Sequence, residues 1–114
     1  MSKRDDAIIL DLMRASQLAV EFLGGLSQQD FDQDLKTQAS VLHQLMVLGE
    51  GVKRLSLEYR SENPQVPWRA IAGMRDTLIH EYDDVDLGEV WRTIRRDVPA
   101  LIQMLERLAP KQDG

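Results

Sequence analysis

The spacing of apolar residues constrains this chain more than any other feature, because it follows steps of three and four along most of the length. Such steps place side chains on one face of an α-helix, whereas a half-buried strand needs strict alternation. Four series show the helical spacing, within 8–22, 35–59, 68–79 and 87–108, and no alternating pattern or internal repeat interrupts them. The sequence therefore predicts an all-α protein, an antiparallel bundle of four to five helices.

Polar, glycine and proline residues between these series predict where the first helices begin and end. The segment Ser2–Asp5 is typical of a helix start, and Gly24–Gly25 of a helix end, since glycine closes a helix without a Cβ clash. Segment 27–34 predicts a short helical turn or a loop that caps the next helix. The next helix is expected to be continuous over Leu35–Tyr59, about seven turns at 3.6 residues each, and to stop before Pro64.

The second half of the chain predicts two more helices. Pro67 suits the first position of a third helix, which we expect to fray near Tyr82. Asp86 and Glu89 have the spacing of a helix N-cap and its reciprocal partner. Pro99 falls inside the final helix and should bend it, because proline removes one backbone donor.

Composition narrows the class of protein. A length of 114 residues suits one domain, 1–114, with one core. The absence of cysteine excludes a disulfide framework and a thiolate metal site. No apolar run approaches the roughly 20 residues needed to cross a bilayer, and the charged N-terminus lacks a signal-peptide core. We therefore expect a cytoplasmic protein that does not bind a membrane.

The net charge of −5 argues against binding of nucleic acid through the overall field of the molecule, since such domains are usually basic. Contact with RNA would need a local positive cluster, which two subunits together could assemble.

Two histidines simplify the search for chemistry. His43 lies in the middle of the second helix, next to Leu42, and is interpreted as a partly buried structural residue. His80 instead lies at the end of the third helix, within the segment Arg75–Tyr82. RNA supplies its own nucleophile, the 2′-hydroxyl, so an imidazole that moves protons and a guanidinium that holds the phosphate suffice for cleavage. This pairing predicts chemistry without a metal or a cofactor.

The spacing of Arg75 and His80 is by itself a weak motif. At about 100° per residue, the two side chains point some 140° apart on one ideal helix. Arg75 falls on the apolar side, where a guanidinium needs a partner, and Glu50, beside Gly49, is one candidate. Alternatively, that side faces a second subunit, and both residues meet in a shared groove.

The segment Arg75–Tyr82 resembles the Arg-x4-His-x-Tyr signature of HepT proteins, the minimal toxins of the HEPN superfamily. Further similarities are Gly49-Glu50, Pro67-Trp68, Gly73-Met74 and the segment from Asp86 to Trp91. They keep the order and approximate spacing of that family, and the resemblance covers residues about 35 to 105.

The resemblance implies a helical bundle that dimerises and cleaves RNA at a groove with arginine and histidine from both subunits. Carried over, Arg75 and His80 are the catalytic pair and Asp76 is a supporting polar residue. It also implies a partner, an MntA-like nucleotidyltransferase antitoxin that transfers AMP to the signature tyrosine, here Tyr82. A bulky anionic adduct beside a phosphate-binding groove would repel RNA.

Other polar clusters have simpler interpretations. The acidic residues Asp83, Asp84 and Asp86 lack the ligand series of a calcium loop and are interpreted as a solvated turn and a helix cap. Trp68 and Trp91 lie on helical stripes and are expected in the core or an interface. The final helix also carries Arg92, Arg95 and Arg96, either a solvated face or a basic patch for the RNA backbone.

A competing function is a non-catalytic HEPN module that binds a nucleotidyltransferase or a nucleotide, which the acidic pI of about 4.9 favours slightly. Sequence-specific DNA binding is disfavoured, since no helix pairs a short turn with a basic recognition face.

Overall fold

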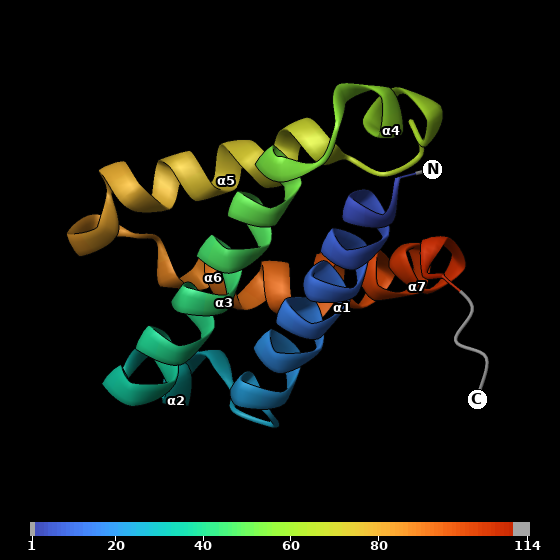
Figure 1. Ribbon diagram of the computed structural model, residues 1–114. Helices are drawn as coiled ribbons and strands as arrows, with labels where there is room; N and C mark the ends of the chain where they lie inside the picture. The colour runs from blue at the N-terminus through green and yellow to red at the C-terminus, as the bar shows by residue number, and fades with distance from the viewer. Residues whose placement is uncertain (1, 111–114) are drawn as a thin grey trace.

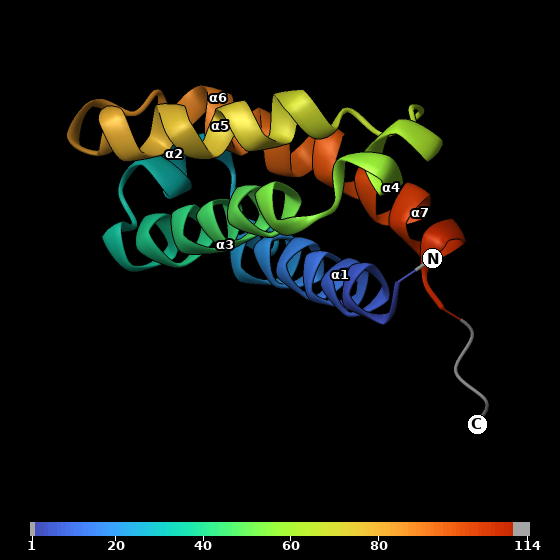
Figure 2. The same ribbon diagram turned by 45° about the horizontal axis from the view of Figure 1, so that its top comes forward.

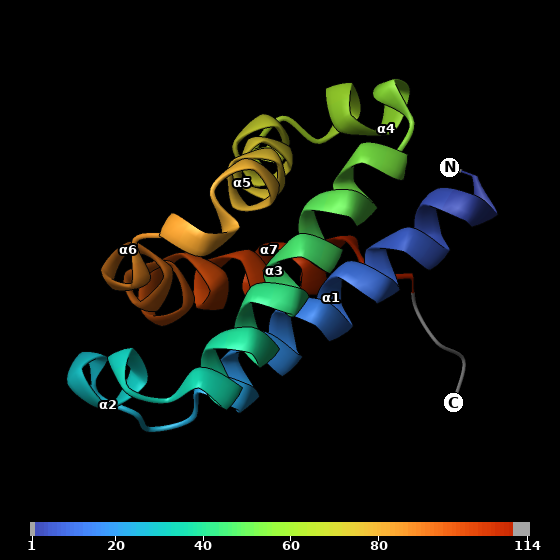
Figure 3. The ribbon, with the colours of Figure 1, turned by 90° about the vertical axis from the view of Figure 1, so that its left-hand side faces the viewer.

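The computed structural model describes residues 2–110, and no β-strand occurs among them. The all-α prediction is confirmed. Helices α1 and α3 lie side by side and run antiparallel, α5 crosses one end of α3, and α7 passes behind α1 (Figure 1). Figures 2 and 3 show the same neighbours from two other directions. In this part of the chain, no helix is both long and apolar enough to cross a membrane.

The first two helices begin and end where the sequence predicts. Helix α1 covers Lys3–Leu23, and the hydroxyl of its N-cap Ser2 accepts a hydrogen bond from the backbone N–H of Asp5 at 3.0 Å. Gly24 ends the helix with φ of 56°, in the region that glycine reaches without a Cβ clash. Of the two forms predicted for segment 27–34, the structure has the helical one, the short helix α2, Gln28–Asp32.

The prediction of one continuous helix over Leu35–Tyr59 is wrong. Helix α3 covers Leu35–Arg54 and α4 covers Leu57–Glu62, with Leu55 extended between them at φ −65° and ψ 143°. The carboxylate of Asp5 accepts hydrogen bonds from the backbone N–H and the hydroxyl of Ser56, at 3.0 and 2.9 Å. Ser56 in turn caps α4. A residue 51 positions away therefore stabilises the break, which leaves the apolar spacing unchanged.

Helix α5, Trp68–His80, starts directly after Pro67 and ends two residues before Tyr82. The indole N–H of Trp68 donates to the carbonyl of Asn63 at 2.9 Å, so the predicted core position of this tryptophan is also hydrogen-bonded. A single 3-10 turn, η1, covers Tyr82–Asp84 and leads to the last helical segment.

The final helix is divided into α6, Leu87–Arg92, a π-helical turn η2, Thr93–Asp97, and α7, Val98–Leu108. Asp86 caps α6 as predicted and accepts from the backbone N–H of Glu89 at 3.1 Å. A π turn lies directly before Pro99, the residue at which a bend is predicted. A wider turn gives space to a proline ring that would otherwise collide with the carbonyl four residues earlier.

Fully buried apolar side chains from α1, α2, α3, η2 and α7 form the core; they include Ile9, Leu12, Phe31, Leu45, Val52, Ile94 and Leu105. The core thus leaves the outer faces of α3 and α5 to carry polar groups.

Candidate active site

Arg75 is fixed at the closest approach of α3 and α5. A β-carbon added at Gly49 on α3 would lie 2.2 Å from the Cβ of Arg75 and 3.1 Å from the carbonyl oxygen of Ile71. Only a residue without a side chain allows this separation of the two helices. The contact sets the position from which the Arg75 side chain extends.

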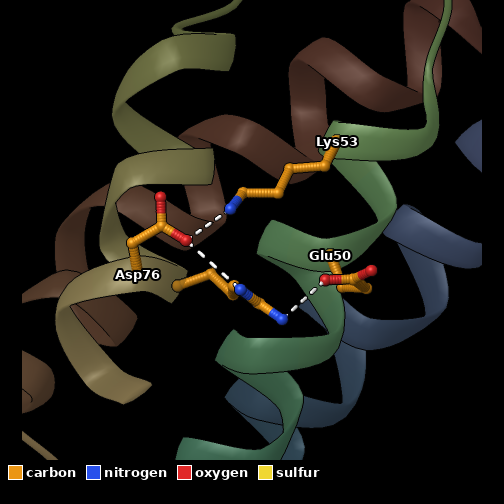
Figure 4. A network of polar contacts seen from close by, with 4 residues as sticks. Glu50, Lys53 and Asp76 are labelled. Atoms are coloured by element: carbon orange, nitrogen blue, oxygen red, sulfur yellow. Dashed lines mark hydrogen bonds and ion pairs between the residues drawn. The ribbon is translucent and has the colours of Figure 1, made fainter. Parts of the chain in front are cut away.

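Two carboxylates orient the guanidinium of Arg75. Its Nη2 is 3.1 Å from Oε2 of Glu50, and its Nη1 is 3.2 Å from Oδ1 of Asp76. Lys53 of α3 forms an ion pair with the same oxygen of Asp76, as Figure 4 shows. The Lys53 hydrogen bond, together with Arg75, holds the pKa of Asp76 below its ordinary value. The predicted partnership of Arg75 with Glu50 is confirmed.

A hollow of about 300 Å³ opens beside Arg75 between α3 and α5. We call it the Arg75 groove, and its lining comprises His43, Met46, Val47, Glu50, Gly51, Arg54, Arg75 and Ile79. The Arg75 side chain lines this groove and is 30% exposed, so a ligand can reach its guanidinium. A phosphate oxygen is the natural ligand for such a planar donor.

The interpretation of His43 as a partly buried structural residue is wrong. His43 is exposed and lies on one stripe of α3 with Val47, Glu50 and Arg54, on the side away from the core, while its neighbour Leu42 is buried. A histidine next to a core leucine along the chain points about 100° away from it, so adjacency does not predict burial.

His80 does not share the Arg75 groove. It is exposed at the last position of α5 and is absent from the groove lining, which agrees with the 140° divergence expected from helix geometry. Tyr82 follows in the 3-10 turn with 49% of its surface exposed. A single chain therefore displays the guanidinium and the imidazole on two different sides of α5.

Comparison with known proteins settles the family. The model of the family described as "Ribonuclease HepT-like" matches residues 12–108. The chain belongs to the HepT-like ribonuclease family. The match includes α3, the whole of α5 and Tyr82, so Gly49, Arg75 and His80 all lie inside the family region. The resemblance seen in the sequence, and an all-α bundle of HEPN type, are confirmed.

Two relatives show how far the similarity extends. A protein named "Probable ribonuclease HepT" from Thermococcus cleftensis is 38% identical over 98 residues, which cover 86% of this chain and 89% of the relative. "Putative RNase TTE0752" from Caldanaerobacter subterraneus is 35% identical over 101 residues, which cover 89% of this chain and 90% of the relative. No solved structure gives a significant match to the chain.

In this HepT-like chain, two arginines of the sequence-predicted basic patch are engaged in internal contacts. Arg92 forms an ion pair with Glu89 at 2.7 Å. Arg95 donates to the carbonyl of Leu26 at 2.8 Å and lies 5.3 Å from the ring centre of Trp91. Arg96 is exposed. None of the three lines the Arg75 groove.

The acidic stretch after α5 is a turn and a cap, as interpreted from the sequence: Asp83 and Asp84 lie in η1, and Asp86 caps α6. Within residues 2–110, no three histidine, aspartate or glutamate side chains gather in a way that could hold a metal ion.

The Arg75 groove itself is not predicted from the sequence. One feature of the sequence could have indicated the groove: His43, Val47, Glu50 and Arg54 follow one another at steps of four, three and four along α3. Three of these residues are polar, and the side chain of Val47 is 38% exposed.

Proposed function

We propose that this chain is a metal-independent endoribonuclease toxin that works as a homodimer in the cytoplasm. The observation that carries the proposal is the guanidinium of Arg75, which two carboxylates hold at the mouth of a groove, five residues before an exposed histidine. Membership of a ribonuclease family supports RNA as the substrate.

The chemistry uses groups that the RNA and the chain already contain. The 2′-hydroxyl oxygen attacks the adjacent phosphorus, the imidazole of His80 takes the hydroxyl proton, and the bond to the 5′-oxygen breaks. That oxygen takes a proton from an imidazolium or from water. Arg75 stabilises the negative charge that develops on the phosphate oxygens. The products are a 2′,3′-cyclic phosphate and a 5′-hydroxyl end.

The divergence of the two side chains on α5 supports the dimer. Because Arg75 and His80 point to different sides, an imidazole from a second subunit is needed beside each guanidinium. Ile79 and Tyr82 support contact between subunits at this end of α5, since their side chains are 46% and 49% exposed, Ile79 one turn after Arg75 and Tyr82 in the 3-10 turn that follows the helix. In a two-fold dimer, each chain then completes the site of the other.

Regulation by AMP transfer fits the position of Tyr82. Its side chain is accessible, two residues after His80, so an MntA-like nucleotidyltransferase antitoxin could reach it. The adenylate would place negative charge and bulk at the entrance for RNA.

The test is cleavage of RNA by purified protein in EDTA. Wild type is expected to leave 2′,3′-cyclic phosphate ends, and Arg75→Ala and His80→Ala are expected to lose activity while keeping the helical circular dichroism and melting temperature of wild type. Arg107→Ala, an exposed arginine on α7, is the control. Cleavage by His80→Ala at the wild-type rate would remove His80 from the mechanism.

A second candidate function is a non-catalytic HEPN module that binds a nucleotidyltransferase, and the net charge of −5 favours it. Under this function, the wild type shows no RNA turnover, and both variants keep their affinity for the nucleotidyltransferase. Intact mass spectrometry after co-expression with that enzyme would show whether adenylate is added to Tyr82 in either case.

A further inference from the structure

We propose that the Arg75 groove continues across α3 onto α1, and that this extension binds the RNA backbone beside the cleaved linkage with little preference for base sequence. The inference rests on the proposed ribonuclease function and adds the path of the substrate strand.

The path is continuous in the structure. A second hollow, of about 260 Å³, lies between α1 and α3, and we call it the α1–α3 hollow. It shares His43, Val47, Gly51 and Arg54 with the Arg75 groove and extends to Arg14 on α1. The two hollows are therefore adjoining parts of one surface, which starts at Arg75 and ends at α1. Figure 3 shows the corresponding helices, with α3 lying between α5 and α1.

The charge of this surface is opposite to that of the whole chain. The protein has 14 lysines and arginines against 19 aspartates and glutamates. The two hollows together contain three arginines and one histidine, Arg14, Arg54, Arg75 and His43, against two carboxylates. A strand of phosphates can be attracted to an acidic protein only where such a local excess of cations exists.

Both carboxylates are already paired, and the pairs are open to exchange. Glu50 is held by Arg75 at 3.1 Å, and Asp11 lies 3.7 Å from Arg54 with both side chains at least half exposed. Exposed ion pairs of this kind contribute little free energy. A phosphate that approaches Arg54 can therefore replace Asp11 at low cost.

The floor of the surface is suited to a backbone strand. Gly51 allows α1 and α3 to approach closely beneath it, because a β-carbon there would lie 2.5 Å from Cδ2 of Leu12. Along the wall, Val47 and Leu18 offer apolar contact to ribose and base without reading base edges. His43 and Arg54 are eleven positions apart on α3, about 16 Å at 1.5 Å per residue, so the hydrogen-bond donors are distributed along the path.

The experiment measures binding without cleavage. The probe is a fluorescein-labelled, single-stranded 2′-O-methyl RNA oligonucleotide, which lacks the nucleophilic hydroxyl, and fluorescence anisotropy gives Kd over a series of salt concentrations. The test variant is Arg14→Gln/Arg54→Gln. The matched control is Arg69→Gln/Arg107→Gln, which also removes two positive charges from exposed arginines that line neither hollow.

The double variant in the groove is expected to lower the slope of log Kd against log salt by about 1.4, at roughly 0.7 for each phosphate contact on a single strand. Its Kd should rise by the same factor for probes of different sequence. The control is expected to keep the wild-type slope. His43→Ala should raise Kd in the same sequence-independent way.

Three results would overturn the path. The first is a wild-type slope of log Kd against log salt in the groove variant, and the second is an equal loss of affinity in the groove variant and the control. The third is a loss of affinity that light scattering traces to dissociation of the dimer, which would make this surface a contact between copies. The ribonuclease proposal fails separately, if unmodified RNA is not cut or if His80→Ala cuts it normally.

Discussion

Gly49 and Arg75 touch so closely that α3 and α5 could not keep their separation with any side chain at position 49, since its β-carbon would lie 2.2 Å from the Cβ of Arg75. We predict that Gly49→Ala lowers the free energy of unfolding by about 1–3 kcal/mol, the usual cost of overpacking. The rate of RNA cleavage should fall by more than the loss of folded protein explains, because Arg75 moves with α5. Urea denaturation and RNA cleavage measure the two effects.

Gly73 provides the matched control for this change. It lies on the same helix as Arg75, and a β-carbon there would meet nothing within 4 Å. Gly73→Ala should therefore stabilise the protein by about 0.5–1 kcal/mol, as alanine does inside a helix. If Gly49→Ala is equally harmless, the helix contact does not determine the position of Arg75.

Glu50→Gln is predicted to separate stability from activity. The Arg75 and Glu50 side chains are 30% and 51% exposed, so loss of the pair should cost less than about 1 kcal/mol. The guanidinium loses one of its two anchors, and a displaced catalytic group can reduce kcat by about a hundredfold. We expect kcat to fall while KM stays constant or decreases. The exposed Glu106 on α7 serves as the control, through Glu106→Gln. A normal kcat in Glu50→Gln would contradict a positioning role for Glu50.

Mixing two inactive variants tests the composite site. Arg75→Ala and His80→Ala chains, unfolded together and refolded, should form mixed dimers in which one of the two sites has both groups. With random pairing, about a quarter of the wild-type activity should return in a two-fold dimer. Each variant alone should remain inactive under the same treatment. No recovery, with mixed dimers shown by mass spectrometry, would mean that the two groups do not come from different chains.

Asp5 predicts a stability change at acidic pH. The backbone N–H of Ser56, the largest contribution, holds the pKa of this buried carboxyl below its usual 3.8. A group whose pKa is lowered by folding stabilises the folded state above its unfolded pKa and loses that effect as the pH falls through the folded pKa. The melting temperature should therefore decrease below about pH 4. Asp5→Ala should remove part of this pH dependence and cost about 1–3 kcal/mol at neutral pH, because the Ser56 donors lose their acceptor.

The sequence predicts the features of this protein that depend on neighbouring residues. Ser2, Gly24 and Asp86 act at helix ends as their chemistry requires. Features that depend on distant residues could not be read in the same way. The break after α3 is held by Asp5 of α1, and apolar spacing gives no sign of it.

The same contrast between neighbouring and distant residues applies to the candidate site. The sequence predicts Arg75, His80 and Tyr82 as site residues from one short segment. It does not identify His43 and Arg54 as neighbours of Arg75, because their proximity depends on how α3 rotates against α5. That rotation is set by Gly49, whose role becomes visible only when the two helices are placed together.

The carboxylates paired with Arg75 compete with the phosphate of a substrate for the same guanidinium. Glu50 and Asp76 each occupy one side of the guanidinium, so an incoming phosphate must displace a carboxylate that is already in place. A free mononucleotide brings a single anionic group to that exchange and has little to compensate for the lost pair. A polymer brings adjacent phosphates that remain bound while one of them exchanges, so the abundant small nucleotides of a cell would be poor inhibitors of this protein.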